Sequence, residues 1–243
     1  MGSLTDLLFE LSSEERMAIL GSLSAERLKL SHVATRLHIT VTETSRHMQR
    51  LTDTGLIQKE ADGTYGVTPY GGLVLSLLPG LDFASQNRKY FTDHLTSVLP
   101  PKLRNRLGEL STGKPLQDTI TIFTNYWLIL SGAEEYTYSI KTNPIPLHET
   151  VKMASTDNRS ILQDDMSLVG GYQLVPGVER RFLPRVQVFL IGSEKEAILC
   201  LPHLDGSMDY CAFKGGDPTF TGWCRDLFLH YWDEARPNPS IAG

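Results

Sequence analysis

Cysteine is scarce in this chain and follows no disulfide or metal-binding pattern. The three cysteines, Cys200, Cys211 and Cys224, all lie in the last quarter of the 243 residues. They form no C-x-x-C pair, and the seven histidines do not cluster around them. Disulfide frameworks and zinc sites of standard spacing need such patterns. We therefore expect no metal, no cofactor and reduced thiols, which are typical of a cytoplasmic protein.

Long apolar runs and an excess of positive charge are also missing. The longest apolar run, residues 71–79, is too short to span a bilayer. The N-terminus lacks the charged start and apolar core of a signal peptide, so no membrane association is expected. Lys and Arg number 23 against 28 Asp and Glu, a formal net charge of -5. Because no overall cationic field exists, any binding to a polyanion must be local.

The composition is that of a globular protein, with 41% hydrophobic and 21% charged residues. The first 80 residues have helical periodicity followed by a hairpin, whereas strands alternate with helices after Pro115. This change predicts two domains, over residues 1–80 and 115–243, joined by a helical connector over residues 81–114.

The N-terminal domain is predicted to begin with a short lead-in helix and a full helix from about Ser13. A two-turn helix over residues 30–37 follows, with Ser31 as its cap. After a tight turn, Thr40 or Thr42 caps a longer helix over residues 41–54. Gly55 closes that helix, since left-handed geometry is favourable there for glycine.

A hairpin is predicted directly after the longer helix. Strand-like residues 56–60 and 65–68 flank the pair Asp62-Gly63, which is a strong signal for a tight hairpin turn. The hairpin forms a wing over about residues 57–67. A further helix restarts at Thr68-Pro69, where proline is tolerated in the first turn.

The longer helix has a polar face suited to a nucleic acid. Its hydrogen-bonding and cationic side chains are Thr42, Thr44, Ser45, Arg46, Gln49 and Arg50. Phosphate contacts fix the register of a protein on DNA, and contacts to base edges discriminate sequence. Arg46 and Arg50 are four residues apart and project on one side, so one would approach a guanine and the other a phosphate. The spacing does not show which of the two arginines contacts the guanine and which the phosphate.

A plain solvated face is the alternative interpretation of this helix. Glu43 and Asp53 belong to the same helix, and residues 1–80 hold seven cations against nine acids. On the wing, Lys59 is placed to meet a phosphate, although Glu60 and Asp62 beside it also fit a solvated hairpin.

Taken in order, these elements resemble a winged helix-turn-helix of the broad ArsR/MarR-like kind found in archaeal regulators, over about residues 6–80. Past the wing, the chain resembles a narrower family, the archaeal winged-helix regulators typified by the methanogen filament-operon regulator of methanogenesis. The matching stretches are Tyr90-Phe-Thr-Asp-His94, residues 99–110 and residues 222–232. The resemblance implies an N-terminal DNA-binding domain and a C-terminal domain that senses an effector and forms dimers.

The same resemblance implies a C-terminal α/β domain akin to phospholipase D that has lost catalysis, in a chain of mixed α+β and α/β class. An active version needs His-x-Lys-x4-Asp. Here His203 is followed by Asp205 in place of the lysine and Tyr210 in place of the aspartate. The sequence also lacks phosphate-binding glycine loops and a Gly-x-Ser-x-Gly elbow. No enzymatic activity is therefore expected.

The C-terminal domain nevertheless offers scattered polar groups and several strands. His148, His230 and the pair Asp164-Asp165 lack the spacing of metal ligands. Strands are expected at residues 136–140, 185–191, 197–201 and 209–213, with the apolar segment 120–130 packed on the sheet and a helix over residues 222–235.

Two groups of residues are candidates for effector binding. Arg180, Arg181 and Arg185 cluster before a strand, and arginine grips carboxylates and phosphates, so a small anionic metabolite is one hypothesis. A solvated turn or local ion pairs is the alternative. A second hypothesis is an apolar pocket, with the candidate lining residues Tyr126, Trp127 and Trp223. For Trp223 the alternative is a stripe of its helix that faces the core.

The sequence thus predicts a homodimeric transcription regulator that binds double-stranded promoter DNA and responds to a small molecule. Residues 41–54 form the recognition helix and residues 57–67 the wing. The alternative is a non-catalytic or unrecognised α/β enzyme-like domain whose helix-turn-helix serves protein-protein contacts.

Overall fold

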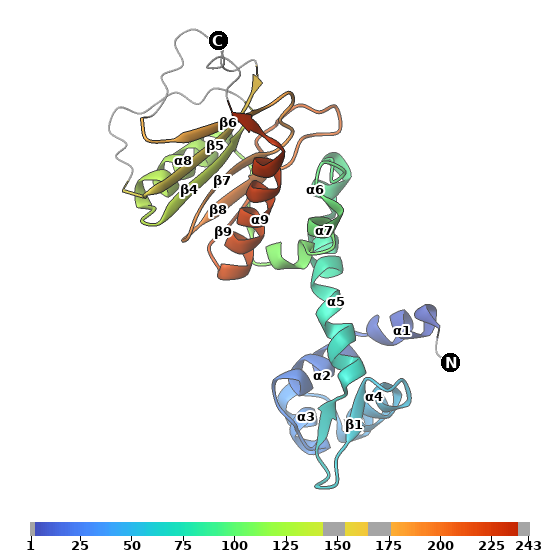
Figure 1. Cartoon of the computed structure of the whole chain (residues 1–243). Coiled ribbons are helices and arrows are strands. Elements are labelled where there is room, and N and C mark those ends of the chain that lie inside the picture. Colours follow the sequence, from blue (N-terminus) through green and yellow to red (C-terminus); the bar gives the residue numbers. More distant parts are fainter. Residues whose placement is uncertain (1–2, 143–153, 165–175, 238–243) are drawn as a thin grey trace. The chain divides into compact units, whose positions relative to one another are not determined.

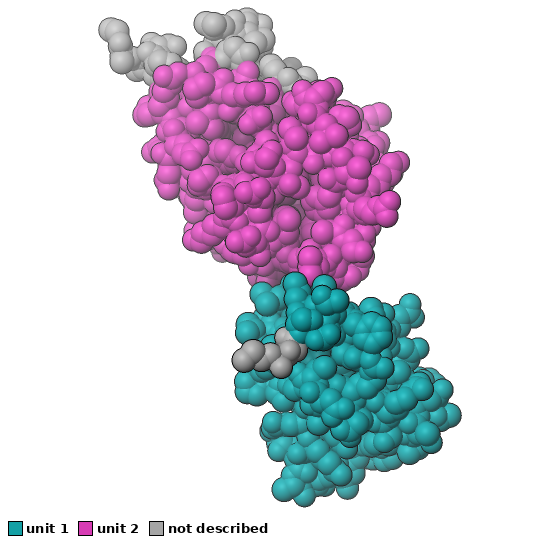
Figure 2. Space-filling model, turned by 90° about the vertical axis from the view of Figure 1, so that its right-hand side faces the viewer, with its two compact units in different colours: residues 1–78 teal, residues 79–243 magenta. Residues whose placement is uncertain are grey.

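The computed structural model describes residues 3–142, 154–164 and 176–237 (Figure 1). The chain divides into two compact units, residues 1–78 and 79–243, coloured separately in Figure 2. Helix α5 (Pro69–Gln86) runs across this division. None of the described helices is both long and apolar enough to cross a membrane.

The first unit contains four helices before a two-stranded hairpin. Their bounds are α1 Leu4–Leu11, α2 Glu14–Ala25, α3 Leu30–Leu37, α4 Val41–Asp53, β1 Ile57–Lys59 and β2 Tyr65–Val67. The hairpin is antiparallel, with Ile57 opposite Val67, and Leu28 forms a bridge to Tyr65 as a minimal third strand. This order of elements is that of a winged helix-turn-helix, as the sequence predicts.

Local capping signals explain where these helices begin. The Ser13 hydroxyl accepts a hydrogen bond from the Arg16 N–H and starts α2. Ser31 was predicted to cap α3, and this is wrong, because it lies inside the helix and Lys29 precedes the first turn without a side-chain cap. His38 ends α3 in the left-handed region, at φ 56°.

A single apolar core holds the first unit together. Ile19, Leu20, Met48, Leu51 and Leu56 are almost completely buried in it. Met48 and Leu51 are one turn apart on α4, so one face of that helix is fixed against α2 and the hairpin. The opposite face of α4 is left to solvent.

The second unit is built on a mixed sheet. Its remaining helices and strands are α6 Arg88–Asp93, α7 Pro101–Arg104, the 3-10 helix η1 Leu107–Leu110, β3 Lys114–Leu116, α8 Thr119–Gly132, β4 Tyr136–Lys141, β5 Asp157–Gln163, β6 Glu179–Leu183, β7 Phe189–Ser193, β8 Ala197–Cys200, β9 Ala212–Gly215, α9 Pro218–Glu234 and β10 Arg236–Pro237. The strand order is β10-β6-β5-β4-β7-β8-β9-β3. Strands β4, β5 and β6 pair in parallel and the other neighbours are antiparallel.

Helices cover both faces of this sheet (Figure 1). Ile140, Leu190 and Leu199 pack with α9 in one core, whereas Phe189, Ile191 and Ile198 pack with α8 in another. Neighbouring residues of β7 thus enter different cores because side chains alternate across a strand. The result is three layers, helix, sheet and helix. The mixed α/β class agrees with the sequence, and the narrower likeness to phospholipase D stays a prediction.

Several C-terminal elements differ from the predicted ones. The strand expected at 209–213 begins only at Ala212, because Tyr210 has φ 58° and cannot continue an extended strand. The strand expected at 185–191 begins at Phe189. The expected strands at 136–140 and 197–201 and the helix over 222–235 are present.

Candidate nucleic-acid interface

Helix α4 starts with a reciprocal capping box. The Thr40 hydroxyl accepts from the Glu43 N–H at 3.2 Å, and the Thr40 N–H donates to Glu43 Oε2 at 3.1 Å. The Thr40 hydroxyl also donates to Glu43 Oε2 at 2.7 Å, and this bond, together with that from the Thr40 N–H, lowers the pKa of Glu43. The Glu43 carboxylate is therefore held at the start of the helix as an anion, and its charge remains part of the argument against a nucleic-acid role.

One strip of α4 is exposed over its first two and a half turns. Its exposed members are Val41, Thr42, Ser45, Arg46 and Gln49. With Arg50 they line a shallow groove along the helix. Val41 is 58% exposed, and the sequence interpretation missed it because only polar and cationic side chains were considered for this face. Its spacing of four from Ser45 and of eight from Gln49 is the signal that could have found it.

Arg46 is the free cation of this strip. Among the residues that the structure describes, its guanidinium makes no hydrogen bond or ion pair with another side chain. Gln49 is different, because its amide donates to Asp53 Oδ1 at 2.7 Å. Gln49 must exchange that bond for one to a ligand, whereas Arg46 has no hydrogen bond to the described residues to exchange and is only attracted by the charge of Glu43.

Thr44 does not belong to the exposed face, and the prediction for it is wrong. It is 0% exposed, and its hydroxyl donates to the Thr40 carbonyl at 2.9 Å. Thr44, Met48 and Leu51 are four and three residues apart, so they share the face of the helix that enters the core. A polar side chain was read as exposed where its position required burial.

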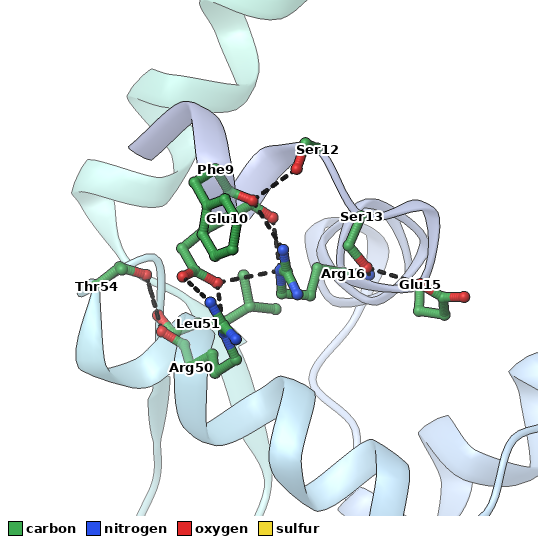
Figure 3. A network of polar contacts seen from close by, with 9 residues as sticks. All are labelled: Phe9, Glu10, Ser12, Ser13, Glu15, Arg16, Arg50, Leu51 and Thr54. Carbon is green, nitrogen blue, oxygen red and sulfur yellow. Dashed lines mark hydrogen bonds and ion pairs between the residues drawn. The ribbon is translucent and has the colours of Figure 1, made fainter. Parts of the chain in front are cut away.

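Arg50 is bound to helix α1 by a glutamate of that helix (Figure 3). Its Nε donates to Glu10 Oε2 at 2.9 Å, and a second guanidinium nitrogen donates to Oε1 at 2.6 Å. Arg16 contacts the same carboxylate at 3.1 Å and donates to the main-chain carbonyls of Phe9 and Glu10. The expectation of a free Arg50 is therefore corrected: this side chain is part of a fork that joins α1 to α4.

The charges of this network support one another. Hydrogen bonding from Arg50 lowers the pKa of Glu10 despite the opposing effect of burial, and Arg16 adds to it. The same bond raises the pKa of Arg50. The Phe9 ring lies 5.2 Å from the Arg50 guanidinium carbon and 6.0 Å from that of Arg16. No sequence pattern could show this, because Glu10 and Arg50 are 40 residues apart.

The wing carries one exposed cation, and a second one reaches it from outside the hairpin. Lys59 is exposed, with its ammonium 5.9 Å from the Tyr65 ring. Arg27, which the sequence interpretation missed, has a side chain 67% exposed and contacts Glu60 at 3.3 Å. Arg27 reaches the hairpin from the segment before α3, so only the fold places it there.

The predicted aromatic effector pocket does not form. Tyr126 of α8 is 1% exposed and packs on one face of the sheet. Trp223 of α9 is 0% exposed and packs on the opposite face. The Trp223 indole N–H donates to the Leu103 carbonyl at 3.1 Å. Trp127 is half-buried beside Tyr126. These three side chains cannot line one cavity, and the alternative of a core-facing Trp223 is confirmed.

The predicted arginine cluster also disperses. Arg181 donates to the Trp232 carbonyl at 2.9 Å and stacks 4.5 Å from the Trp232 ring. Arg180 directly precedes Arg181 in β6, so its side chain lies on the other face of the sheet, where it donates to the Val178 carbonyl. Arg185 lies beyond the end of β6, close to Gly206. Because the three guanidinium groups do not converge, they form no shared anion site.

Metal ligands do not gather in the described ranges 3–142, 154–164 and 176–237, where no three potential ligand side chains meet. His148 and Asp165 lie outside those ranges. His203 contacts Asp205 at 3.7 Å, and His230 contacts Glu234 at 3.5 Å.

Comparison with known proteins finds remote structural likenesses. Neither protein-family profiles nor curated proteins match the chain. One similar solved structure is TrmBL2, described as an archaeal chromatin protein with a novel mode of DNA binding; it has a TM-score of 0.43 and 11% identity, over 93% of this chain and 94% of that one. Another is reduced HlyU from Vibrio cholerae, with a TM-score of 0.28 and 27% identity, over 32% of this chain and 85% of that one. Both scores are too low for either likeness to identify a function.

Proposed function

We propose that this chain is a sequence-specific regulator of transcription that binds double-stranded DNA with α4 in the major groove. The observation that carries the proposal is the outer strip of α4, which is polar, exposed and backed by a buried core. A helix of this kind is the element that a winged helix-turn-helix presents to base edges. The wing would lie along the adjacent backbone.

The exposed residues divide the work by their chemistry. Arg46 has the fork that reads a guanine, and Gln49 has the amide that reads an adenine. Thr42 and Ser45 supply hydroxyls to either bases or phosphates, and Val41 suits a thymine methyl group. On the wing, Lys59 serves as a phosphate contact that carries no sequence information.

A second copy of this chain is the proposed partner of α5. Tyr70, Leu73 and Leu77 are 46%, 58% and 68% exposed in the single chain. They are three and four residues apart, so they form one apolar stripe along the helix. A stripe of this kind marks an interaction surface, and pairing through it would bring two recognition helices to two half-sites. The two half-site contacts, each weak alone, then give a higher overall affinity because the dimer links them.

We further propose that the second unit senses a small molecule and is not an enzyme. The resemblance to the methanogen regulator family supports this division of roles, and membership of that family stays a prediction. In the alternative proposal, the helix-turn-helix binds another protein. The acid excess of the first 80 residues and the sequestered Arg50 favour that alternative.

Fluorescence anisotropy with the DNA upstream of the chain's own gene tests the proposal. Affinity should exceed that for a scrambled duplex, and the logarithm of the binding constant should fall linearly with the logarithm of salt concentration. Arg46→Ala should weaken specific binding by roughly five- to 150-fold, equivalent to about 1–3 kcal/mol for a lost base contact.

The matched control is Arg104→Ala, which removes the same charge from an exposed position of α7 in the second unit. It should bind like the parent protein. Equal affinity for both duplexes, or equal losses in both variants, would reject base reading by α4 and favour the protein-contact alternative.

A further inference from the structure

A pocket of about 560 Å³ lies at the β3 end of the sheet in the second unit. Its walls come from three separate stretches, residues 86–94, 115–117 and 203–213. None of the predicted effector residues lines it. Its volume falls within the range of small-molecule sites, roughly 300–1,000 Å³.

A buried histidine and an aspartate form one side of the pocket. His94 is 6% exposed, and its Nε2 lies 3.2 Å from each carboxylate oxygen of Asp209. Its Nδ1 lies 2.8 Å from the Tyr90 carbonyl oxygen. Because a carbonyl and a carboxylate only accept hydrogen bonds, both ring nitrogens are satisfied when each carries a proton. His94 then has no donor left for a ligand.

The Asp209 carboxylate can accept further hydrogen bonds on the side that faces the pocket. It accepts from His94 and from the Cys211 N–H at 2.9 Å, yet its side chain is 33% exposed. Burial opposes its charge, but the Cys211 and His94 hydrogen bonds prevail and lower the pKa of Asp209. A carboxylate with a free lone pair calls for a donor on the ligand, such as an ammonium group.

Two further charged groups of the pocket form no hydrogen bond or ion pair with the residues that the structure describes. Lys89 and Asp93 are four residues apart on α6, and both line the pocket. Among the described residues, neither side chain makes a hydrogen bond or an ion pair. The pocket therefore presents a free cation and free carboxylate capacity at the same time.

An apolar wall completes the pocket and is held rigidly. Tyr90 stacks on His94 at 3.8 Å and meets Phe213 edge-on at 4.7 Å. The Tyr90 hydroxyl accepts from the Leu201 N–H at 2.9 Å and donates to the Cys211 carbonyl at 3.3 Å. Leu116 of β3 contributes further apolar surface to the pocket.

We propose that this pocket binds a small zwitterion of the amino-acid class. Its ammonium group would donate to Asp209 and Asp93, its carboxylate would pair with Lys89, and its side chain would pack on Leu116 and Tyr90. An anion such as free phosphate would meet two carboxylates and one lysine. A metal ion would lack a third ligand, since no three potential metal-ligand side chains come together among the described residues.

Isothermal titration of the full chain with individual standard L-amino acids, at millimolar concentration, tests the site. At least one should bind, and its carboxamide and its N-acetyl derivative should each bind at least ten-fold more weakly. Failure of every amino acid to bind would overturn the proposal. Equal binding of the N-acetyl derivative would indicate a simple anion site and would overturn it too.

Variants locate the binding. Lys89→Gln and Asp93→Asn break no hydrogen bond or ion pair among the residues that the structure describes, so both should fold normally and lose affinity at least ten-fold. Lys102→Gln is the matched control, because this exposed lysine lies on α7 and does not line the pocket. Unchanged affinity in the first two variants would place the ligand elsewhere.

Regulation by this ligand rests on the proposed function, and the two can fail separately. The bound amino acid should shift the anisotropy-measured DNA affinity of the parent chain and leave that of Lys89→Gln unchanged. An amino acid that binds to a chain unable to bind DNA would reject the proposed function and leave the pocket assignment standing. DNA binding that no amino acid alters would reject the regulatory role.

Discussion

Glu10→Gln tests how strongly α1 is joined to the recognition helix. The substitution preserves size and hydrogen-bonding shape but removes the charge between Arg16 and Arg50. In the parent protein, Glu10 is 8% exposed and Arg16 is 7% exposed, so this part of the network is shielded from water. The Arg50 side chain is 41% exposed, and solvent screens its share of the interaction.

The expected loss follows from these exposures. A charge-assisted hydrogen bond contributes about 1.5–3 kcal/mol and a neutral one about 0.5–1.5 kcal/mol. Arg16 keeps its bonds to the carbonyls of Phe9 and Glu10, which limits the cost of leaving it without a counter-charge. We expect Glu10→Gln to lower the free energy of unfolding of the first unit by about 2 kcal/mol at neutral pH.

The loss should depend on pH in a defined direction. The folded pKa of Glu10 lies below its ordinary value of 4.5. Its charge therefore stabilises the fold fully above pH 4.5, and this stabilisation disappears as the pH falls through the lower, folded pKa. The difference between parent and variant should stay constant near neutrality and shrink below that range.

Urea unfolding of the full chain provides the assay. The three tryptophans, Trp127, Trp223 and Trp232, all belong to the second unit, so their fluorescence reports that unit alone. Far-ultraviolet circular dichroism reports both units. Glu10→Gln should shift the unfolding transition of the first unit, which circular dichroism detects, and should leave the tryptophan-fluorescence transition unchanged.

The control is Glu26→Gln, which breaks an ion pair with Arg36 whose side chains are 55% and 44% exposed. It should change the free energy of unfolding by less than about 0.5 kcal/mol. If both variants unfold like the parent, or if the tryptophan transition moves as well, the Glu10 network does not stabilise the first unit as described.

Three further predictions concern other parts of the molecule. Leu77→Glu places a charge in the proposed α5 stripe, and light scattering should show the mass fall from two chains to one; a variant that stays dimeric would move the interface elsewhere. Trp223→Ala should destabilise the second unit by about 3–5 kcal/mol in chemical denaturation, because it empties a fully buried site. Asp217 caps α9 by accepting from the Thr219 and Phe220 N–H groups, and Asp217→Ala should cost about 1 kcal/mol. Burial opposes the charge of Asp217, yet hydrogen bonds, first that from Thr112, lower its pKa to about 2, so its contribution should be lost as the pH falls from 3.8 towards 2.

Local turn and capping signals allow the elements of the first unit to be predicted from the sequence. The pair Asp62-Gly63 and the glycine at position 55 specify turns by their own backbone preferences, and both glycines adopt positive φ angles. Ser13 and Thr40 act on N–H groups three residues away. Interactions of this range depend on neighbours in the chain, so a pattern is enough to predict them.

Longer-range arrangements were not accessible in this way. Strands β5 and β6 were missed because their charged residues, such as Arg159 and Glu179, hide the pattern of a strand that is only partly buried. The pocket joins Asp93, Leu116 and Asp209, which no spacing rule connects. The predicted effector residues failed for the same reason, because aromatic and arginine side chains say nothing about which face of a sheet they occupy.

By itself, the sequence determined a winged helix-turn-helix with a polar-faced helix over residues 41–54, followed by a mixed α/β domain. Only the tertiary structure decided which polar groups of that helix are available. Thr44 turned into the core, Arg50 paired with a glutamate from another helix, and Arg46 formed no hydrogen bond or ion pair with the residues that the structure describes. The physical reason is that helix formation and capping depend on residues within one turn, whereas exposure and ion pairing depend on which surfaces the fold brings together.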